Sequence, residues 1–383
     1  MAARRIAVGF DIPPQPPLGF VRGLALFARL VRLDSIMVAD HFQNLFPTAL
    51  WDEEFSWVAN QNLSPHELFE YQVLLGYLAS RAGRLRIGVG VTEPIRRHPV
   101  LIAQTMLTLA HITKRPPILG IGAGERENIE PYGLSFTKPV SRLEEALQII
   151  RLCFSPQSSI DFRGKHYELD RAPMHLRPPE DKYPDVWIAA DGPRMLRLTG
   201  KYGDGWYPTA QLSSDEYAAK LEIVQAAARE AGRDPEEITP ALHQFVVVAP
   251  TEQEARAMLG TKAVRYGALL APADLWRKAG SKHPFGEEFR GYFDVVPEWY
   301  DRKTLDEALA AVPAEVIGYA LLWGTPEQVA SKLRGFGEVG LRHVVLNLAS
   351  MLISRRAALY ALRAIRRIAR LLGSKPWLGA KPG

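Results

Sequence analysis

Residues 85–122 read LRIGVGVTEPIRRHPVLIAQTMLTLAHITKRPPILGIG, and this stretch decides the fold class. Two short apolar runs rich in β-branched residues, 85–91 and 117–122, enclose a longer apolar segment with helical periodicity. Short continuous apolar runs are typical of strands buried on both faces, and such strands pair in parallel through crossover helices. The stretch therefore predicts a strand, a helix and a second, parallel strand.

The same alternation extends along the chain. Further strand-like runs lie at 4–12, 35–40, 186–190, 205–208, 244–249 and 343–347, and helical periodicity is found at 142–154, 214–231 and 326–336. The tetrapeptide Ser-Pro-His-Glu at 64–67 predicts another helix start, with serine as the cap and proline in the first position. About eight strands in this order favour a closed (β/α)8 TIM barrel over an open, doubly wound sheet.

The length of 383 residues is compatible with two or three domains or with one enlarged barrel. We expect one domain over 1–383, with insertions at about 43–63, 156–182 and 270–318 at the C-terminal face of the strands. The first and last insertions are rich in aromatic residues, which favours lids or binding loops. The alternative is that these aromatics cap the barrel or form a dimer interface. Within the middle insertion, 160–170 predicts a small hairpin.

The composition excludes several classes of protein. With 47% hydrophobic and 23% charged residues, the chain is neither disordered, collagen-like nor a coiled coil, and a net charge of +5 gives no reason to expect nucleic acid. No apolar stretch approaches the roughly 18 residues of a spanning helix, and the N-terminus has no signal-peptide core, so we expect a cytoplasmic protein. The single cysteine, Cys153, lies in an apolar run and predicts a buried structural thiol.

Titratable residues follow two of the predicted strands directly. Asp40 and His41 end the second strand, and Glu125 and Asn128 follow the fourth. Because the active site of a barrel is built from the carboxyl ends of its strands, we expect these side chains to converge on one mouth. A lone histidine there is usually structural, but three titratable groups together indicate a proton-transferring site. No second histidine lies at ligand spacing, so we expect no metal.

Glycines indicate where a ligand could approach the backbone. Gly120, Gly122 and Gly124 alternate along and beyond the fourth strand, which permits a flat ring or a phosphate to come close. This spacing looks like a dinucleotide fingerprint, but it does not lie on the first strand of a strand–helix–strand unit. Gly192 opens the helix after the fifth strand, where free amides could hold a phosphate and Arg194 could add positive charge. The alternative is an ordinary helix start.

Several longer motifs together carry a family resemblance. They are ADHFQ (39–43), HPVLIAQTMLTLAHIT (98–113), GAGERENIEPYG (122–133), AADGPRML (189–196) and GTPEQVASKL (324–333). The chain resembles the luciferase-like flavin and deazaflavin oxidoreductases over essentially its whole length. More narrowly, it resembles the branch that depends on coenzyme F420, and within that branch the phthiodiolone dimycocerosate ketoreductases.

The resemblance implies a barrel that holds the deazaflavin at its mouth. It also implies an activity that transfers a hydride to or from a carbonyl carbon. His41 and Glu125 would then be the proton-transferring residues. Asp40 would bond the ring and, as the neighbour of His41, could fix the tautomer of the histidine or raise its pKa. A non-prolyl cis peptide bond would join Gly90 and Val91. The residues that match cofactor-binding positions are Asp40, Gly90, Val91, Thr92, Ala123, Gly124, Asn128, Asp191, Gly192, Arg194 and Met195.

The substrate is predicted less directly. Thr209 and Lys282 match substrate positions, but Leu212 stands where the related sugar-phosphate dehydrogenases carry a basic residue. A dianionic phosphate needs several cations, so we expect a large apolar ketone of lipid or polyketide type. Alternatives are an F420-dependent sugar-phosphate or alcohol dehydrogenase, an FMN-dependent monooxygenase and a homologue without turnover.

We also expect a homodimer. The C-terminal segment 354–375 combines an apolar stripe with several arginines. It is either the last barrel helix with a solvated basic face, or a surface that contacts anionic membrane.

Overall fold

The computed structural model describes residues 5–61, 64–155, 158–179, 182–209 and 212–373. The predicted strand residue 4, parts of the predicted insertions (62–63, 156–157 and 180–181) and the end of the basic segment (374–375) lie outside the described residues. Within the described part, no helix is both long and apolar enough to cross a membrane.

Eight parallel strands close into a barrel, which confirms the predicted fold class. Each neighbouring pair is hydrogen-bonded in parallel, and the β8–β9 pair closes the ring. All eight predicted strand-like runs correspond to barrel strands. In their order around the barrel these are β1 (Ala7–Ile12), β2 (Ser35–Val38), β3 (Arg86–Thr92), β4 (Ile118–Ile121), β7 (Asp185–Ile188), β8 (Gly205–Trp206), β9 (Thr239–Val248) and β11 (His343–Asn347).

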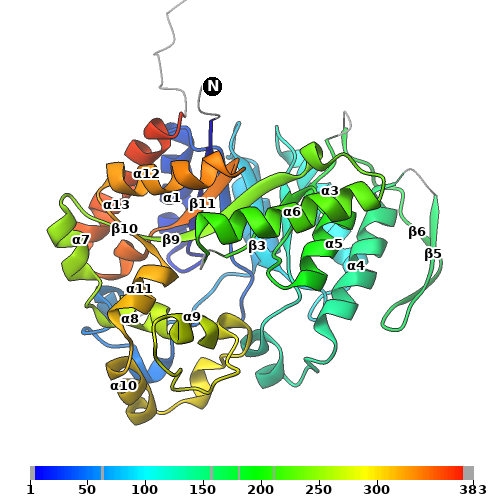
Figure 1. Ribbon diagram of the computed structural model, residues 1–383. Coiled ribbons are helices and arrows are strands. Elements are labelled where there is room, and N and C mark those ends of the chain that lie inside the picture. The colour runs from blue at the N-terminus through cyan, green and yellow to red at the C-terminus, as the bar shows by residue number, and fades with distance from the viewer. Residues whose placement is uncertain (1–4, 62–63, 156–157, 180–181, 210–211, 374–383) are drawn as a thin grey trace, which may run out of the picture.

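Helices surround the strands, as Figure 1 shows. The outer helices are α1 (Leu18–Leu30), α2 (Tyr71–Ala79), α3 (Pro99–Ile112), α4 (Pro139–Phe154), α5 (Pro193–Tyr202), α6 (Ser214–Glu230), α12 (Pro326–Glu338) and α13 (Arg355–Leu371). The predicted helix start at Ser64 is wrong. The Ser64 hydroxyl accepts the amide of His66 in a local turn, and α2 begins only after Glu70, whose carboxylate accepts the amide of Val73.

The strand β10 (Leu322–Gly324) was not predicted, because its residues continue an apolar segment that is helical up to Ala320. It pairs in parallel with the carboxyl end of β9, beyond the part of β9 that pairs with β11. The chain between β9 and β10 holds short helices, which Figure 1 shows grouped on one side of the barrel. They are α7 (Glu252–Met258), α8 (Lys262–Leu269), α9 (Ala273–Lys278), α10 (Arg302–Ala310) and α11 (Ala314–Ala320).

The two aromatic insertions pack against each other. Arg302 of the last insertion pairs with Asp52 of the first at 2.9 Å. Phe46 and Phe55 from the first insertion also contact Tyr266 of α8, just ahead of the last insertion, at ring-centroid distances of 6.2 and 5.8 Å. The predicted hairpin is present as β5 (Ser159–Arg163) and β6 (Glu168–Pro173), and it lies at the opposite edge of the molecule in Figure 1. The aromatic segments therefore build one wall beside the barrel, and the hairpin takes no part in it.

Large side chains fill the barrel interior where glycine makes room. Trp187 on β7 is fully buried among Met37, Ile118 and Val345 from other strands. A Cβ atom on Gly205 of β8 would come within 2.4 Å of the indole, so glycine is required there.

Cys153 is buried, and burial raises the pKa of its thiol to about 11, which confirms the predicted structural thiol.

Candidate active site

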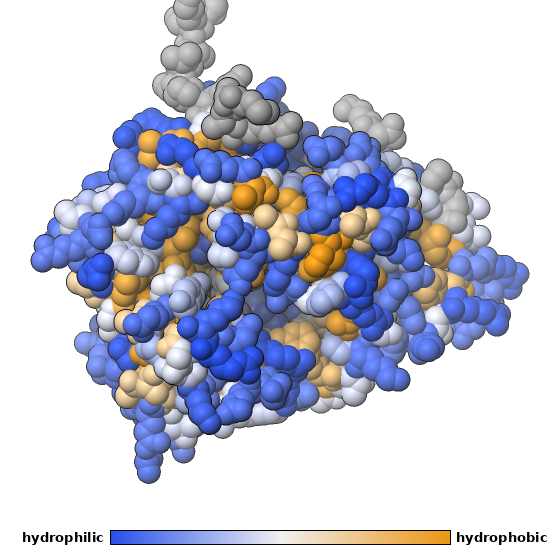
Figure 2. Space-filling model, viewed as in Figure 1, coloured by the Kyte–Doolittle hydropathy of each residue, from blue (hydrophilic) through white to orange (hydrophobic). Residues whose placement is uncertain are grey.

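Two cavities meet at the carboxyl ends of the barrel strands. One, of about 340 Å³, is lined mainly by apolar side chains from the barrel mouth and the aromatic insertions; we call it the apolar cavity. The other, of about 660 Å³, is lined by charged and polar residues around β3, β4 and the start of α5; we call it the polar cavity. Figure 2 shows that this face of the molecule is hollowed near its centre. The residues that line both cavities are Val91, Glu125, Ala189, Thr209 and Tyr292.

The junction of the cavities is built by an irregular end of β3. The peptide bond between Gly90 and Val91 is cis, as the resemblance implies. The pairing of β3 with β4 shifts register between Val89 and Thr92, so Val91 stands out of the regular ladder. Its side chain lies against Gly122 of the next strand end, at 3.4 Å from the position of a Cβ atom there. The backbone thus forms a low ridge between the cavities.

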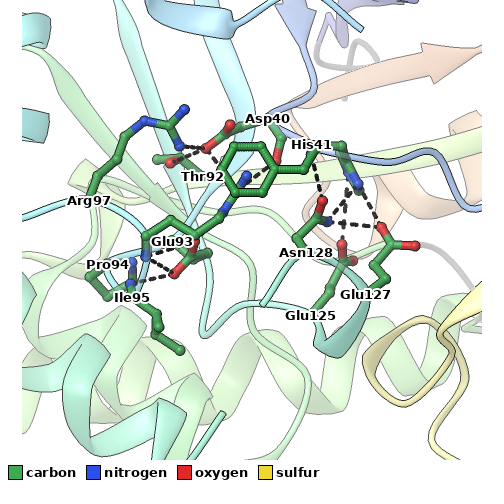
Figure 3. Close-up of polar contacts among 12 residues, drawn as sticks. Asp40, His41, Thr92, Glu93, Pro94, Ile95, Arg97, Glu125, Glu127 and Asn128 are labelled. Carbon is green, nitrogen blue, oxygen red and sulfur yellow. Dashed lines mark hydrogen bonds and ion pairs between the residues drawn. The ribbon is translucent and has the colours of Figure 1, made fainter. Parts of the chain in front are cut away.

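His41 is held by two residues that follow β4. Its Nδ1 lies 2.7 Å from Oε1 of Glu127 and 2.9 Å from Nδ2 of Asn128. The Asn128 amide also donates to Glu127 at 2.9 Å, and its oxygen accepts the backbone amide of Phe42 at 2.7 Å. Because a carboxylate accepts and an amide nitrogen only donates, the Nδ1 proton is donated to Glu127 (Figure 3), and the Asn128 amide donates to Glu127 rather than to Nδ1. Nε2 is then the nitrogen that faces Glu125.

Glu125 lies on the other side of the imidazole. Its Oε2 is 3.8 Å from Nε2 of His41, and about a third of its side chain remains exposed toward the cavities. Burial lowers the pKa of His41, but the hydrogen bond to Glu127 and the charges of both glutamates outweigh this and raise it to about 9. Burial raises the pKa of Glu125 to about 7, against the opposing charge of His41. The pair therefore carries transferable protons near neutral pH.

Asp40 belongs to a different group of contacts, as Figure 3 shows. Its Oδ2 accepts from the Thr92 hydroxyl at 2.7 Å and from Arg97 at 2.7 Å, and it pairs with Arg96 at 3.0 Å. The suggestion that Asp40 fixes the tautomer of His41 is therefore wrong, because Glu127 occupies that position. Asp40 still lines the polar cavity, where it can contact a bound ring.

The residues predicted to hold the cofactor come together, with one exception. All of them except Arg194 line one or both cavities. Gly192 caps α5 without a side-chain bond, and the space beside its Cα is open, so the first amides of the helix are available to an anion. Arg194 instead pairs with Glu144 at 2.7 Å, and its side chain is more than half exposed. The prediction for Arg194 is corrected because that ion pair holds it away from the cavities.

Of the two predicted substrate residues, one lines the cavities and the other does not. Thr209 follows β8 and lines both cavities. The side chain of Lys282 is 86% exposed, pairs with Glu287 at 3.0 Å and lines neither cavity. The prediction for Lys282 is therefore corrected, because its ammonium group points into solvent from the insertion between β9 and β10.

Two functional positions were missed by sequence reasoning. Glu127 is fully buried, and its second oxygen, Oε2, has no hydrogen-bond partner among the described residues. Arg96 is also buried, contacts Asp40 and Glu93, and lies over the ring of Phe42 at 4.7 Å. The i, i+2 spacing of Glu125 and Glu127 in an irregular strand end was the available signal, because it can turn both carboxylates toward one side.

The same group of side chains could ligate a cation. One ligand atom each from His41, Glu125 and Glu127 lies within 4.8 Å of the others. The expectation of no metal rested on the lack of a second histidine, and this set of one nitrogen and two oxygens did not enter it. The Nδ1 bond to Glu127 already accounts for the tight spacing without an ion.

The fold and site define a luciferase-like oxidoreductase. A family model described as luciferase-like monooxygenase matches residues 9–343, and the chain belongs to this family. The phthiodiolone/phenolphthiodiolone dimycocerosates ketoreductase of Mycobacterium bovis is 37% identical over 338 residues, which cover 88% of each chain. An F420-dependent glucose-6-phosphate dehydrogenase of Nakamurella multipartita is 28% identical and aligns over 91% of this chain and 92% of its own.

A solved structure has the same fold. An F420-dependent secondary alcohol dehydrogenase in complex with an F420-acetone adduct superposes with a TM-score of 0.75, at 19% identity, over 96% of this chain and 99% of its own. The chain is thus similar to ketoreductases and dehydrogenases of one family, and we conclude that it is an oxidoreductase enzyme.

Proposed function

We propose that this chain reduces a large apolar ketone with a reduced F420 deazaflavin as the hydride donor. The observation that carries the proposal is the position of His41 and Glu125, a proton-bearing pair that opens on the apolar cavity beside the junction with the polar cavity. A carbonyl carbon at the junction would face a ring in one cavity, while its oxygen would face an acid. We propose that the whole chain, 1–383, acts as one such catalytic unit.

The polar cavity fits a flat ring with an anionic tail. The ridge at Val91 and the glycine at 122 permit close approach of a ring, and Asp40 and Thr92 offer polar groups at its edge. The open N-terminus of α5 and the guanidinium of Arg277 offer donors to phosphate, on a wall that also carries carboxylates. These carboxylates are Asp191, Asp274, Glu287 and Glu288. FMN would use the same features, and we favour F420 because the alcohol and glucose-6-phosphate dehydrogenases described above depend on it by name.

The reaction requires one hydride and one proton. When bound, a reduced deazaflavin supplies the hydride from C5 of its ring. Glu125, protonated in part near neutral pH, is placed to give its proton to the carbonyl oxygen as negative charge develops there. The His41 imidazolium, whose Nε2 lies 3.8 Å from Glu125, stabilises that charge, and Glu125, which is about a third exposed, regains its proton from solvent. In the direction of alcohol oxidation, the Glu125 carboxylate accepts the proton.

The walls of the apolar cavity favour a large apolar substrate. Leu45, Phe46, Leu270, Leu321 and Leu352 line it from both aromatic insertions and from the segment after β11. The apolar area that such a ligand would bury favours a lipid-like or polyketide-like chain over a sugar phosphate. The described part of this cavity places neither lysine nor arginine on its wall.

One anaerobic experiment tests this function. The purified protein is titrated with F420 and with FMN, and the reduced cofactors are then mixed with long-chain methyl ketones. We expect binding of F420 and its reoxidation at a stoichiometry of one alcohol per cofactor. Binding of FMN alone, with turnover only when oxygen is admitted, would establish the monooxygenase alternative instead. Cofactor binding without reduction of any carbonyl compound would support a homologue without turnover.

The pH dependence of ketone reduction follows from the raised pKa of Glu125. A group that must be protonated loses its contribution as the pH rises through its pKa, so we expect the rate to fall above pH of about 7. Glu125→Gln removes this limb and leaves a slower reaction that falls where His41 loses its proton, below the wild-type value of about 9 because the charge of Glu125 that raises the pKa of His41 is gone. Profiles of kcat for both proteins, measured across the pKa values of both groups, make the check. An unchanged alkaline limb in the variant would contradict the role of Glu125.

Assembly and location stay predictions. We propose that the protein is cytoplasmic and that it is a homodimer. The dimer is supported by exposed apolar side chains on outer helices: Phe20, Leu26 and Leu30 on α1, Val73 on α2 and Leu101 on α3. Such a row would be covered in a dimer.

The basic helix α13 has the position of the last barrel helix. Ala361, Ile365 and Ile368 are buried against the barrel, whereas Leu359 is 62% exposed beside the arginines, and Arg367 pairs with Glu327. If this face also contacts membrane during uptake of a lipid substrate, co-sedimentation with vesicles should rise with their content of anionic lipid. Binding that is indifferent to anionic lipid would leave α13 with a structural role alone.

A further inference from the structure

The apolar cavity contains a second group of polar side chains, separate from His41 and Glu125. Asp11 on β1 accepts two hydrogen bonds at Oδ2, one from Nε2 of His243 on β9 at 3.2 Å and one from Nδ2 of Asn347 on β11 at 2.8 Å. All three residues line the apolar cavity. The proton-transfer mechanism uses none of them.

Strand register explains why these three side chains meet. Gly9 of β1 is in register with Val345 of β11, and Val345 with His243 of β9. Because side chains alternate along a strand, Asp11 and Asn347 point inward one layer above Gly9 and Val345. His243, in register with Val345, lies one layer below them and reaches Asp11 from β9, so the group joins the two uppermost layers of the barrel interior across three neighbouring strands.

The two polar groups lie on different sides of the mouth. Asp11, His243 and Asn347 belong to β9, β11 and β1, which are neighbours in the sheet. His41, Val91 and the glutamates belong to β2, β3 and β4 or to the segments that follow them. In a closed barrel of eight strands these sets are centred three strands apart, which is close to opposite. A ligand in the apolar cavity can therefore meet one polar group at each side.

The free atoms of the second group are hydrogen-bond acceptors. Because the Asp11 carboxylate accepts, Nε2 of His243 is the donor, and in the neutral form of the ring Nδ1 presents a lone pair. Asn347 donates through its amide nitrogen, which leaves its side-chain oxygen free to accept. Among the residues that the structure describes, neither Nδ1 of His243 nor Oδ1 of Asn347 has a hydrogen-bond partner, and both residues line the apolar cavity. Two acceptors in a mainly apolar wall favour a ligand group that donates, because a ligand that displaces water from them without donating would leave them unpaired.

We propose that Asp11, His243 and Asn347 form a binding site for a hydroxyl group of the substrate, distinct from the carbonyl that is reduced. The substrate class is then an apolar hydroxyketone, with its two oxygen functions separated by a stretch of hydrocarbon. Asp11 acts through the other two residues: it fixes the tautomer of His243 and the orientation of the Asn347 amide. This inference rests on the proposed ketone reductase function and adds the second oxygen function to its substrate.

Matched substrates test the proposal. Long-chain methyl ketones are compared with the same ketones carrying one hydroxyl at successive positions along the chain, with reduced F420 in excess. We expect one hydroxyl position to raise kcat/KM at least about tenfold over the unsubstituted ketone, as one hydrogen bond to an otherwise unpaired buried group does. His243→Leu should reduce this ratio to about one.

A second variant and a control complete the design. Asn347→Ser gives the same comparison if the leucine variant does not fold, and Lys282→Ala, which alters an exposed side chain outside both cavities, should keep the wild-type ratio. Calorimetry with the matching diol and monoalcohol provides a readout without turnover. The wild type should bind the diol more tightly than the monoalcohol, and the variants should bind the two equally. A ratio near one for every hydroxyl position in the wild type would overturn the proposal. So would an unchanged ratio in the folded variants. Reduction of neither type of ketone would instead refute the proposed function on which this inference rests.

Discussion

Replacing His41 by alanine lowers the turnover number for ketone reduction by about a hundredfold or more, while the dissociation constant for the deazaflavin stays near that of the wild type. His41 lines the apolar cavity and does not line the polar cavity, so its loss leaves the proposed cofactor contacts in place. What is lost is a positive charge 3.8 Å from Glu125, beside the position where the carbonyl oxygen becomes negative.

The measurement is a single-turnover reaction of the reduced cofactor complex, followed by the absorbance of the deazaflavin, together with a fluorescence titration of cofactor binding. His175→Ala is the matched control, because His175 is exposed and only bonds the backbone oxygen of Ser158. We expect the control to keep wild-type rates. If His41→Ala keeps turnover within about threefold of the wild type, the histidine is not part of the proton transfer.

The barrel could be predicted from the sequence because most of its strands are short, mainly apolar runs. Fully buried strands such as β2 and β4 need no alternation, so their pattern survives in one sequence. The exact starts of helices and the shortest strands were harder to predict. Ser64 has the residue spacing of a helix cap, yet its hydroxyl bonds the nearer amide of His66, and α2 starts later. The three residues of β10 continue an apolar segment that is helical up to Ala320, and only their pairing with β9 makes them a strand.

In the candidate site, too, some residues could be located from the sequence and others could not. Residues that end strands, such as His41 and Glu125, could be located because a barrel directs every strand end to one mouth. Lys282 and Arg194 could not be placed, because an exposed cation can pair with any of several nearby carboxylates. In the structure Lys282 pairs with Glu287, and Arg194 pairs with Glu144. Asp40 was assigned to the adjacent His41 by its position in the chain. Both residues lie beyond the end of β2 at Val38, and the structure separates their contacts.

Glu127→Gln lowers turnover at pH 8 by at least about tenfold and shifts the titration of His41 to lower pH, because the variant removes the charge that holds the imidazolium. The wild-type pKa of His41 is raised to about 9, with the bond to Glu127 as the main cause that opposes burial. A neutral amide accepts the Nδ1 proton less strongly and can also present its own N–H group there, which would turn the tautomer over.

The readout must separate this positioning role from a merely structural one. Proton NMR of His41 gives its pKa directly, and the pH profile of kcat gives the same group in the reacting complex. Glu130→Gln is the matched control, since Glu130 pairs with Arg126 near the surface and lines neither cavity. Glu127→Asp keeps a carboxylate and should recover part of the raised pKa. If the histidine still titrates near pH 9 in the glutamine variant, the charge of Glu125 alone sustains the imidazolium, and Glu127 serves only to pack the turn after β4.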